Sequence, residues 1–77
     1  MNMKIIDLDR TVHSLTEEYP EIIDIMVDLG FDAIANPATR NTAGRFITIP
    51  NGARMQGIDL ATIIATFEEH GFVIKSE

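Results

Sequence analysis

Hydrophobic side chains recur with the spacing of an α-helix in three stretches of the chain, residues 12–18, 20–29 and 60–70. In each stretch most polar residues fall on the opposite side of the helix, so one face can pack inward while the other meets water. Thr11 and Asp59 stand just before two of these stretches, where a side-chain oxygen can accept hydrogen bonds from the first free N–H groups. The pattern therefore predicts three amphipathic helices, two of them with an identifiable N-cap.

Prolines and glycines mark the expected helix ends. The first helix should end at Tyr19, because a residue that precedes a proline avoids helical backbone angles, and Pro20 itself suits the first position of the second helix. Gly30 and Gly71 are expected to close the second and third helices in left-handed conformations. Each is followed by a phenylalanine, and Phe31 can fold back onto the last turn as in a Schellman motif.

Short apolar runs stand near both ends of the chain, at residues 3–8 and 72–74. The first is a candidate edge strand. We expect residues 72–74 to pair with residues 3–6 as a two-stranded ribbon, which would bring the termini together. Because a ribbon of this size is only marginally stable alone, it should rest on helices.

The middle of the chain carries weaker signals. Asn36 precedes a proline and is expected to cap one short helix, and Thr42 is expected to cap a second that runs through Phe46. Residues 50–52 should form a turn, or the first turn of a helix that ends near Gly57. The apolar side chains of this region that are available to pack inward are Phe46, Ile47, Ile49, Ala53 and Met55. The predicted fold is mainly all-α, a compact array of four to five short helices with a small two-stranded ribbon joining the N- and C-terminal runs.

Length and composition limit the class of protein. The 77 residues suffice for one small helical domain, 1–77, whose core leaves little volume for a deep pocket. The net charge of −6 argues against nucleic-acid binding. The absence of cysteine excludes disulfides and cysteine-held metal centres and favours a cytoplasmic protein. The N-terminus has no signal-peptide pattern, and no segment approaches the roughly 18 apolar residues of a membrane span.

The charges are unevenly distributed along the chain. Residues 1–32 carry eight acidic and two basic residues, and residues 59–77 carry four acidic residues and one basic residue. Residues 33–58, called the central segment below, contain no acidic residue but hold three arginines, three of the five glycines and two of the three prolines. The plain explanation is ordinary solubility with uneven charges. The sharper interpretation is a mildly basic surface that faces a partner or accepts an anion.

No group of residues predicts catalysis or metal binding. His13 and Glu17 are one helical turn apart, but without further ligands we expect only a weak surface pair. His70 lies in the last turn of its helix, where the helix dipole favours a positive imidazole. The sequence has no nucleophile beside a base and no phosphate-binding or dinucleotide fingerprint. We therefore expect a protein that is not an enzyme and has neither cofactor nor metal.

The candidate binding residues lie in the central segment. The expected helix starts at Asn36 and Thr42 would present free N–H groups and a partial positive charge near Arg40 and Arg45. The candidate ligand- or partner-binding residues are Asn36, Arg40, Asn41, Thr42, Gly44, Arg45 and Arg54. The alternative explanation is that these residues only cap helices, while Arg40 and Arg45 pair with acidic neighbours.

Three blocks of the sequence resemble the bacterial family called domain of unknown function 1858. They are TVHSLTEEYPEIIDIMVDLGFD at 11–32, NTAGRFITIPNGA at 41–53 and IDL at 58–60, so the likeness spans nearly the whole chain. The resemblance implies a compact helical domain that occurs alone or at the front of larger proteins with hemerythrin-like or sensor-like regions.

One branch of that family is described as a redox-disulfide domain associated with hybrid-cluster proteins. Its Cys-x-x-Cys motif stands directly after Gly-Phe-Asp and before a proline, where this chain has Ala33 and Asn36. Neither residue can form a thiolate or exchange disulfides, so the redox role does not carry over. The cysteine-less branch, whose biochemical role is unassigned, is the closer likeness.

Two functions remain open, and an enzyme is the least favoured reading. The first is a non-catalytic interaction or regulatory module that binds a protein partner, or itself as a homodimer, through the central segment. The second is a domain that holds a small anion or metabolite on helix N-termini with Arg40 or Arg45. A partner surface should expose apolar side chains such as Phe46, Ile47 or Met55 beside the arginines. A ligand site should instead show a concave pocket with converging N–H groups.

Overall fold

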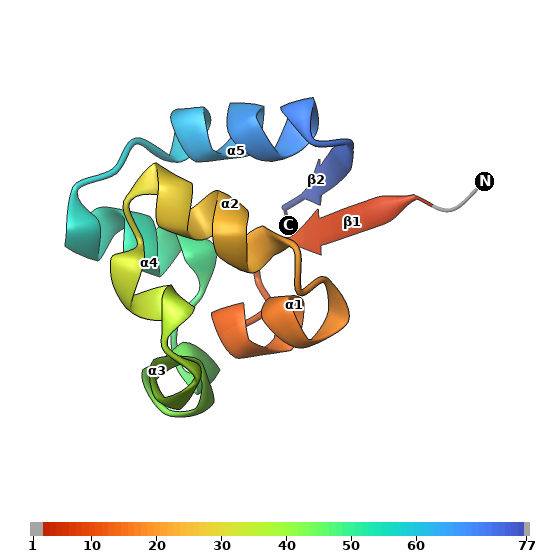
Figure 1. Ribbon diagram of the computed structural model, residues 1–77. Coiled ribbons are helices and arrows are strands. Elements are labelled where there is room, and N and C mark those ends of the chain that lie inside the picture. Colours follow the sequence, from red (N-terminus) through yellow and green to blue (C-terminus); the bar gives the residue numbers. More distant parts are fainter. Residues whose placement is uncertain (1–2, 77) are drawn as a thin grey trace.

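The chain folds mainly into helices, with one short strand near each end (Figure 1). The computed structural model describes residues 3–76. The elements in chain order are β1 (Lys4–Asp7), α1 (Val12–Glu18), α2 (Ile22–Leu29), η1 (Asp32–Ala35), α3 (Pro37–Asn41), η2 (Ala43–Arg45), α4 (Ile49–Gln56), α5 (Leu60–Glu69) and β2 (Phe72–Lys75), where η marks a 3-10 helix. The predicted helical array with a terminal two-stranded ribbon is confirmed.

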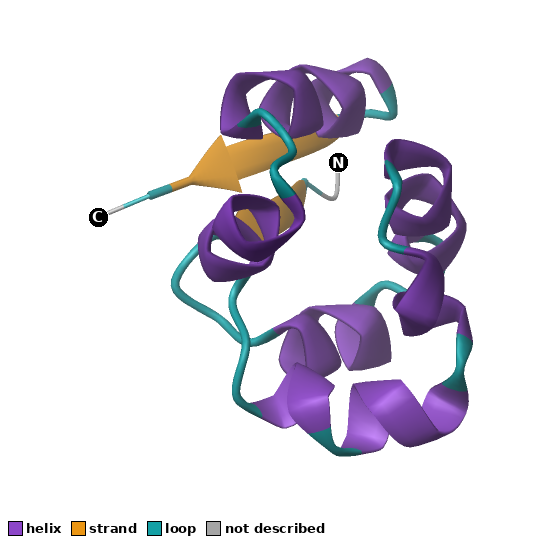
Figure 2. Cartoon of the chain, turned by 90° about the vertical axis from the view of Figure 1, so that its left-hand side faces the viewer, coloured by secondary structure: helices purple, strands orange, loops and turns teal. Residues whose placement is uncertain are grey.

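The ribbon is parallel. Lys4 of β1 lies opposite Phe72 of β2, and Asp7 lies opposite Lys75. The ribbon packs beside α5, as both views show (Figures 1 and 2), and the helices between the strands form the crossover that a parallel pair requires. The expectation that the pairing brings the termini together is wrong. Because the two strands run in the same direction, Lys4 and Lys75 lie at opposite ends of the ribbon.

Local hydrogen bonds determine where the helices start. Thr11 Oγ1 accepts a hydrogen bond from the N–H three residues ahead at 3.1 Å, and Asp59 Oδ1 accepts one from the N–H two residues ahead at 3.2 Å. Both predicted N-caps are therefore confirmed. The second helix begins later than expected, at Ile22 rather than at the preceding proline. The Ile22 N–H bonds to the Tyr19 carbonyl at 3.0 Å, a spacing of three residues that makes a turn rather than an α-helix.

The end of α2 is the predicted Schellman motif. Gly30 has a φ of 116°, in the left-handed half of backbone space. The N–H groups of Gly30 and Phe31 donate to the carbonyls of Val27 and Met26, both at 3.0 Å. This pair of bonds turns the chain sharply and directs Phe31 into the core, where it is 6% exposed.

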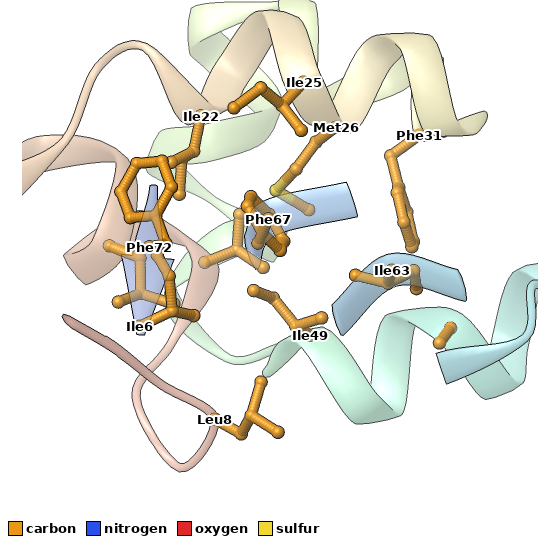
Figure 3. Packing of buried hydrophobic residues seen from close by; sticks show 13 residues of the cluster. Ile6, Leu8, Ile22, Ile25, Met26, Phe31, Ile49, Ile63, Phe67 and Phe72 are labelled. Atoms are coloured by element: carbon orange, nitrogen blue, oxygen red, sulfur yellow. The ribbon is translucent and has the colours of Figure 1, made fainter. Parts of the chain in front are cut away.

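The core is a cluster of apolar side chains contributed by both strands and by α1, α2, α4 and α5 (Figure 3). Phe67 lies at its centre with no exposed surface, and its ring meets that of Phe72 edge to face with centroids 5.8 Å apart. Phe72 meets Tyr19 in the same way, at 5.5 Å. These aromatic contacts join α5, β2 and the end of α1, so the ribbon rests on helices as expected.

Two exposed ion pairs lower carboxyl pKa values on the N-terminal side of the molecule. A hydrogen bond from Arg10 holds the pKa of Glu18 below its usual value, and a hydrogen bond from Lys4, 2.7 Å long, lowers the pKa of Glu21. Each folded-state pKa lies below the unfolded one. The contribution of each pair to stability is therefore present above the unfolded pKa and is lost as pH falls through the folded pKa.

The two pairs should titrate independently. We expect Arg10→Met to raise the titration midpoint of Glu18 alone and Lys4→Met to raise that of Glu21 alone, because each substitution removes the positively charged hydrogen-bond donor of one carboxylate. Carboxyl carbon chemical shifts followed by NMR across the acidic range measure both midpoints, and each variant serves as the control for the other. A variant that moves both midpoints together would contradict this pairing.

Candidate functional site

The central segment lies on the side of the molecule away from the ribbon in the view of Figure 1, where α3 and α4 are seen. It passes through η1, α3, η2 and α4, all of them short. Short helices leave most of their terminal carbonyls without a backbone partner. Several polar side chains of the segment bond to these carbonyls.

Two of the three arginines hold backbone carbonyls. Arg40 Nη1 donates to the carbonyls of Ile34 at 2.7 Å and Ala35 at 3.1 Å, which lie at the end of η1. Arg45 Nε donates to the carbonyl of Asn41 at 2.8 Å, at the end of α3. Arg40 therefore closes a helix end, whereas Arg45 uses only one of its nitrogen atoms in this way.

The positive charge of the central segment is not neutralised within the described residues. The ion pairs in residues 3–76 are Lys4 with Glu21, Arg10 with Glu18 and Lys75 with Asp7. Arg54 donates to the side-chain oxygen of Asn51 instead. The alternative explanation that Arg40 and Arg45 pair with acidic neighbours is therefore wrong for this part of the chain.

At the two expected helix starts, the side chains of Asn36 and Thr42 form hydrogen bonds with nearby backbone groups. Asn36 Oδ1 accepts from the Ala38 N–H at 2.9 Å, which confirms Asn36 as a cap. Thr42 stands at the N-cap position of η2, as predicted, but its side chain makes no cap hydrogen bond there. Its hydroxyl instead donates to the carbonyl of Ala38 at 2.7 Å and so closes the end of α3. With five residues in α3 and three in η2, each start aligns only a few peptide dipoles. This arrangement gives little support to an anion site.

Gly44 and Asn41, the other two candidate residues, have structural contacts. Gly44 is buried, and a Cβ built there would lie 3.5 Å from the Thr39 carbonyl oxygen and 3.6 Å from the backbone nitrogen of His13. These are ordinary van der Waals distances, and they show that η2 packs against the start of α1 at this position. Asn41 is exposed and contributes its carbonyl to Arg45.

The described residues contain neither a metal-binding cluster nor a membrane-spanning helix. No group of three histidine or carboxylate side chains in residues 3–76 is arranged so that it could hold a metal ion. None of the helices in that range combines the length and hydrophobicity needed to cross a bilayer.

Two apolar side chains of the central segment point into solvent. Phe46 is 83% exposed and Met55 is 71% exposed, so the expectation that they are available to pack inward is wrong. On α4 the buried positions are Ile49 and Ala53, and Met55 lies about 200° around the helix from Ala53. Phe46 ends η2, and the chain then turns so that Ile47 and Ile49 face the interior.

A cavity of about 180 Å³ opens into the central segment, and Met55 forms part of its lining. Its lining residues are Val12, Met26, Phe31, Ala33, Ile34, Thr39, Ala43, Gly44, Ile47, Ile49, Gly52, Met55 and Gln56. Met26, Phe31 and Ile49 are buried and belong to the core, whereas Met55 is exposed. None of the described residues places a charged side chain in this lining. Sequence reasoning missed the cavity because the lining comes from six elements, the turn after α2 and the loop before α4.

One wall of the cavity depends on two glycines far apart in the chain. Gly30 closes α2 and directs the ring of Phe31 toward α4. At Gly52 a Cβ would lie 3.3 Å from Phe31 Cε1 and 3.5 Å from Ile47 Cγ2, so the missing side chain lets α4 pack closely against that ring. The wall is thus set by core packing rather than by mobile surface groups.

Comparison with known proteins supports the likeness seen in the sequence. The crystal structure of the conserved domain protein from Streptococcus pneumoniae TIGR4 is similar, with a TM-score of 0.92 and 33% sequence identity over 97% of this chain and 95% of that chain. No curated protein matches the chain. The family model described as "Domain of unknown function (DUF1858)" matches residues 6–64. Because that match covers well over half of the sequence, the chain belongs to the DUF1858 family.

Proposed function

We propose that this domain is a non-catalytic, cytoplasmic interaction or regulatory module that binds another protein through the central segment. The observation that carries the proposal is the exposure of Phe46 and Met55, at 83% and 71%. Each directly follows an arginine, Arg45 or Arg54. Aromatic residues, methionine and arginine are the residue types that protein–protein interfaces enrich.

Burial of these exposed side chains against a partner would contribute favourable free energy to binding. Burying a phenylalanine or methionine side chain fully is worth about 1.5–3 kcal/mol relative to leaving it in water. Arginine and aromatic side chains also dominate the few interface positions that carry most of the binding energy. Phe46 with Arg45, and Met55 with Arg54, therefore supply the groups that a central interface cluster requires.

The alternative function, binding of a small anion or metabolite, has less support. Arg40 and Arg45 already donate to backbone carbonyls. The cavity of the central segment is lined by apolar groups and has no charged side chain. The partner we propose is a protein or a second copy of this chain, whose residues 1–32 carry eight acidic residues.

Site-specific photocrosslinking in the native cell tests this proposal. A photoreactive phenylalanine analogue at position 46 is expected to crosslink one specific protein, or a second copy of the chain, which mass spectrometry identifies. The double variant Arg45→Glu, Arg54→Glu carrying the same analogue should yield at least about tenfold less product, because reversing both charges replaces attraction by repulsion. Arg40 is left unchanged, since it makes two hydrogen bonds to the end of η1, whereas Arg45 makes one to the end of α3.

The control places the same analogue at Met3, which is 64% exposed and precedes β1. Position 3 should not yield the product obtained from position 46. Equal crosslinking from both positions, or an unchanged yield in the charge-reversed variant, would show that the central segment is not the binding surface.

A further inference from the structure

We infer that the cavity of the central segment receives one large apolar side chain, presented by an acidic segment of the protein partner. This inference rests on the proposed interaction function and specifies the chemistry of the partner. It is carried by three observations on the same part of the molecule: the size of the cavity, its apolar lining, and the arginines that have no carboxylate partner in residues 3–76.

The size of the cavity favours a single side chain over a metabolite. Pockets that bind drug-sized molecules usually enclose about 300–1,000 Å³. This cavity encloses about 180 Å³. An apolar cavity of roughly 150 Å³ is enough for benzene, so the ring of a phenylalanine or the branched end of a leucine fits the available space.

The lining selects for an apolar occupant. Among residues 3–76, Thr39 and Gln56 are the only polar side chains of the lining, and neither carries a charge. A charged or strongly polar group entering here would lose its hydration without gaining enough partners. Met26 lies among the core residues and Met55 is exposed, and both have flexible thioether chains that can adapt to an aromatic or an aliphatic side chain.

The charge distribution selects for acidic residues around that side chain. The central segment holds three arginines and no acidic residue, whereas the chain on either side of it is acidic. An acidic partner segment is attracted to this surface and repelled by the rest of the domain, which fixes where it docks. A basic segment would be drawn to the other surfaces instead.

Two neighbouring alanines of η1 provide a matched pair of variants. Ala33 and Ala35 are both exposed, but only Ala33 lines the cavity. Ala33→Leu therefore places extra volume at the cavity, and Ala35→Leu adds the same volume outside it. Because neither residue belongs to the core, both variants should keep the wild-type thermal unfolding curve to within a few degrees.

A direct probe of the cavity is toluene at millimolar concentration, followed by NMR of the purified domain. The amide signals of Gly44 and Gly52, which line the cavity, should shift with a saturable dependence on toluene. The shift should persist in Ala35→Leu and be lost in Ala33→Leu. Unshifted signals in the wild-type domain, or equal shifts in the two variants, would overturn the inference.

Peptide selection tests the chemistry of the occupant. Twelve-residue random peptides displayed on phage and selected on the purified domain at low salt should be rich in Asp and Glu and share one Phe, Leu or Met. Replacing that apolar residue by alanine should weaken binding at least about tenfold, as truncating a central anchor does. Ala33→Leu should weaken binding to a similar degree, and Ala35→Leu should bind within about twofold of wild type.

The outcomes separate this inference from the proposed function. Selected peptides that lack acidic residues, lack an apolar anchor, or bind Ala33→Leu and Ala35→Leu equally would overturn the inference. If position 46 still crosslinks a partner in the cell, the interaction function then stands and only the anchored side chain is refuted. If crosslinking fails although toluene occupies the cavity, it is the proposed function that falls.

Discussion

Replacing Phe67 by alanine is expected to lower the free energy of unfolding by about 3–5 kcal/mol, the usual cost of removing a buried phenylalanine. The ring has no exposed surface and lies at the centre of the core (Figure 3). It also makes the edge-to-face contact with Phe72, which in turn contacts Tyr19. The substitution therefore leaves a cavity and removes the contact through which α5 supports β2.

This loss is large compared with the total free energy of unfolding of the domain. At roughly 0.05–0.15 kcal/mol per residue, a chain of 77 residues is stabilised by only about 4–12 kcal/mol. A domain of this size also buries only about 60% of the surface of its unfolded chain, so it has little reserve. We expect a visible unfolded population of the Phe67→Ala variant even without denaturant if wild-type stability lies near the lower limit.

Urea unfolding followed by far-UV circular dichroism measures the effect, and Phe46→Ala is the matched control. Phe46 is 83% exposed, so its truncation should change the free energy of unfolding by less than about 0.5 kcal/mol. The two variants lose the same atoms from opposite environments. Comparable losses of stability in both would mean that Phe67 does not occupy the centre of the core.

Much of the fold can be predicted from the sequence because its signals are local. Thr11, Asn36 and Asp59 each accept a hydrogen bond from an N–H two or three residues ahead, so residue type and position suffice. Gly30 ends a helix through bonds that reach back only a few residues. Even the terminal ribbon could be predicted, since both of its runs are apolar and short, although its direction depends on how the helices between them pack.

The candidate site was harder to predict because its features depend on contacts distant in the chain. Phe46 and Met55 look like core residues in composition, yet both are exposed, because the chain turns inward only after Phe46 and because Ile49 and Ala53 occupy the buried face of α4. Arg40 looks free in the sequence, yet it reaches back to the carbonyls at the end of η1. The cavity is the least local feature, since its lining extends from α1 to α4.

Core and site are connected through the turn at the end of α2. The left-handed conformation of Gly30 permits the two hydrogen bonds of the Schellman motif, and these position Phe31. Phe31 is at once a buried core residue and part of the cavity wall against which Gly52 packs. A change in backbone conformation at Gly30 should therefore alter both the stability of the domain and the shape of the cavity.

Gly30→Ala is for this reason expected to lower the free energy of unfolding by about 2–3 kcal/mol, near the upper end of the cost of a strained backbone conformation. The φ of 116° lies beyond the narrow left-handed region that residues with a Cβ tolerate. An added Cβ would also lie 3.2 Å from Ile58 Cδ1, so that side chain would have to move.

Gly57→Ala is the matched control, because Gly57 also closes a helix in a left-handed conformation. Its φ of 71° and ψ of 29° lie close to the left-handed region open to other residues, and a Cβ there would meet nothing within 4 Å. We expect this variant to lose only about 1 kcal/mol, the lower end of the cost of that conformation for an L-residue. Urea unfolding of both variants under the same conditions gives the difference. Equal losses would mean that the helix cap alone matters, whereas a larger loss at Gly30 means that its φ of 116° and the closeness of Ile58 to the missing Cβ both require glycine at the turn that leads into Phe31.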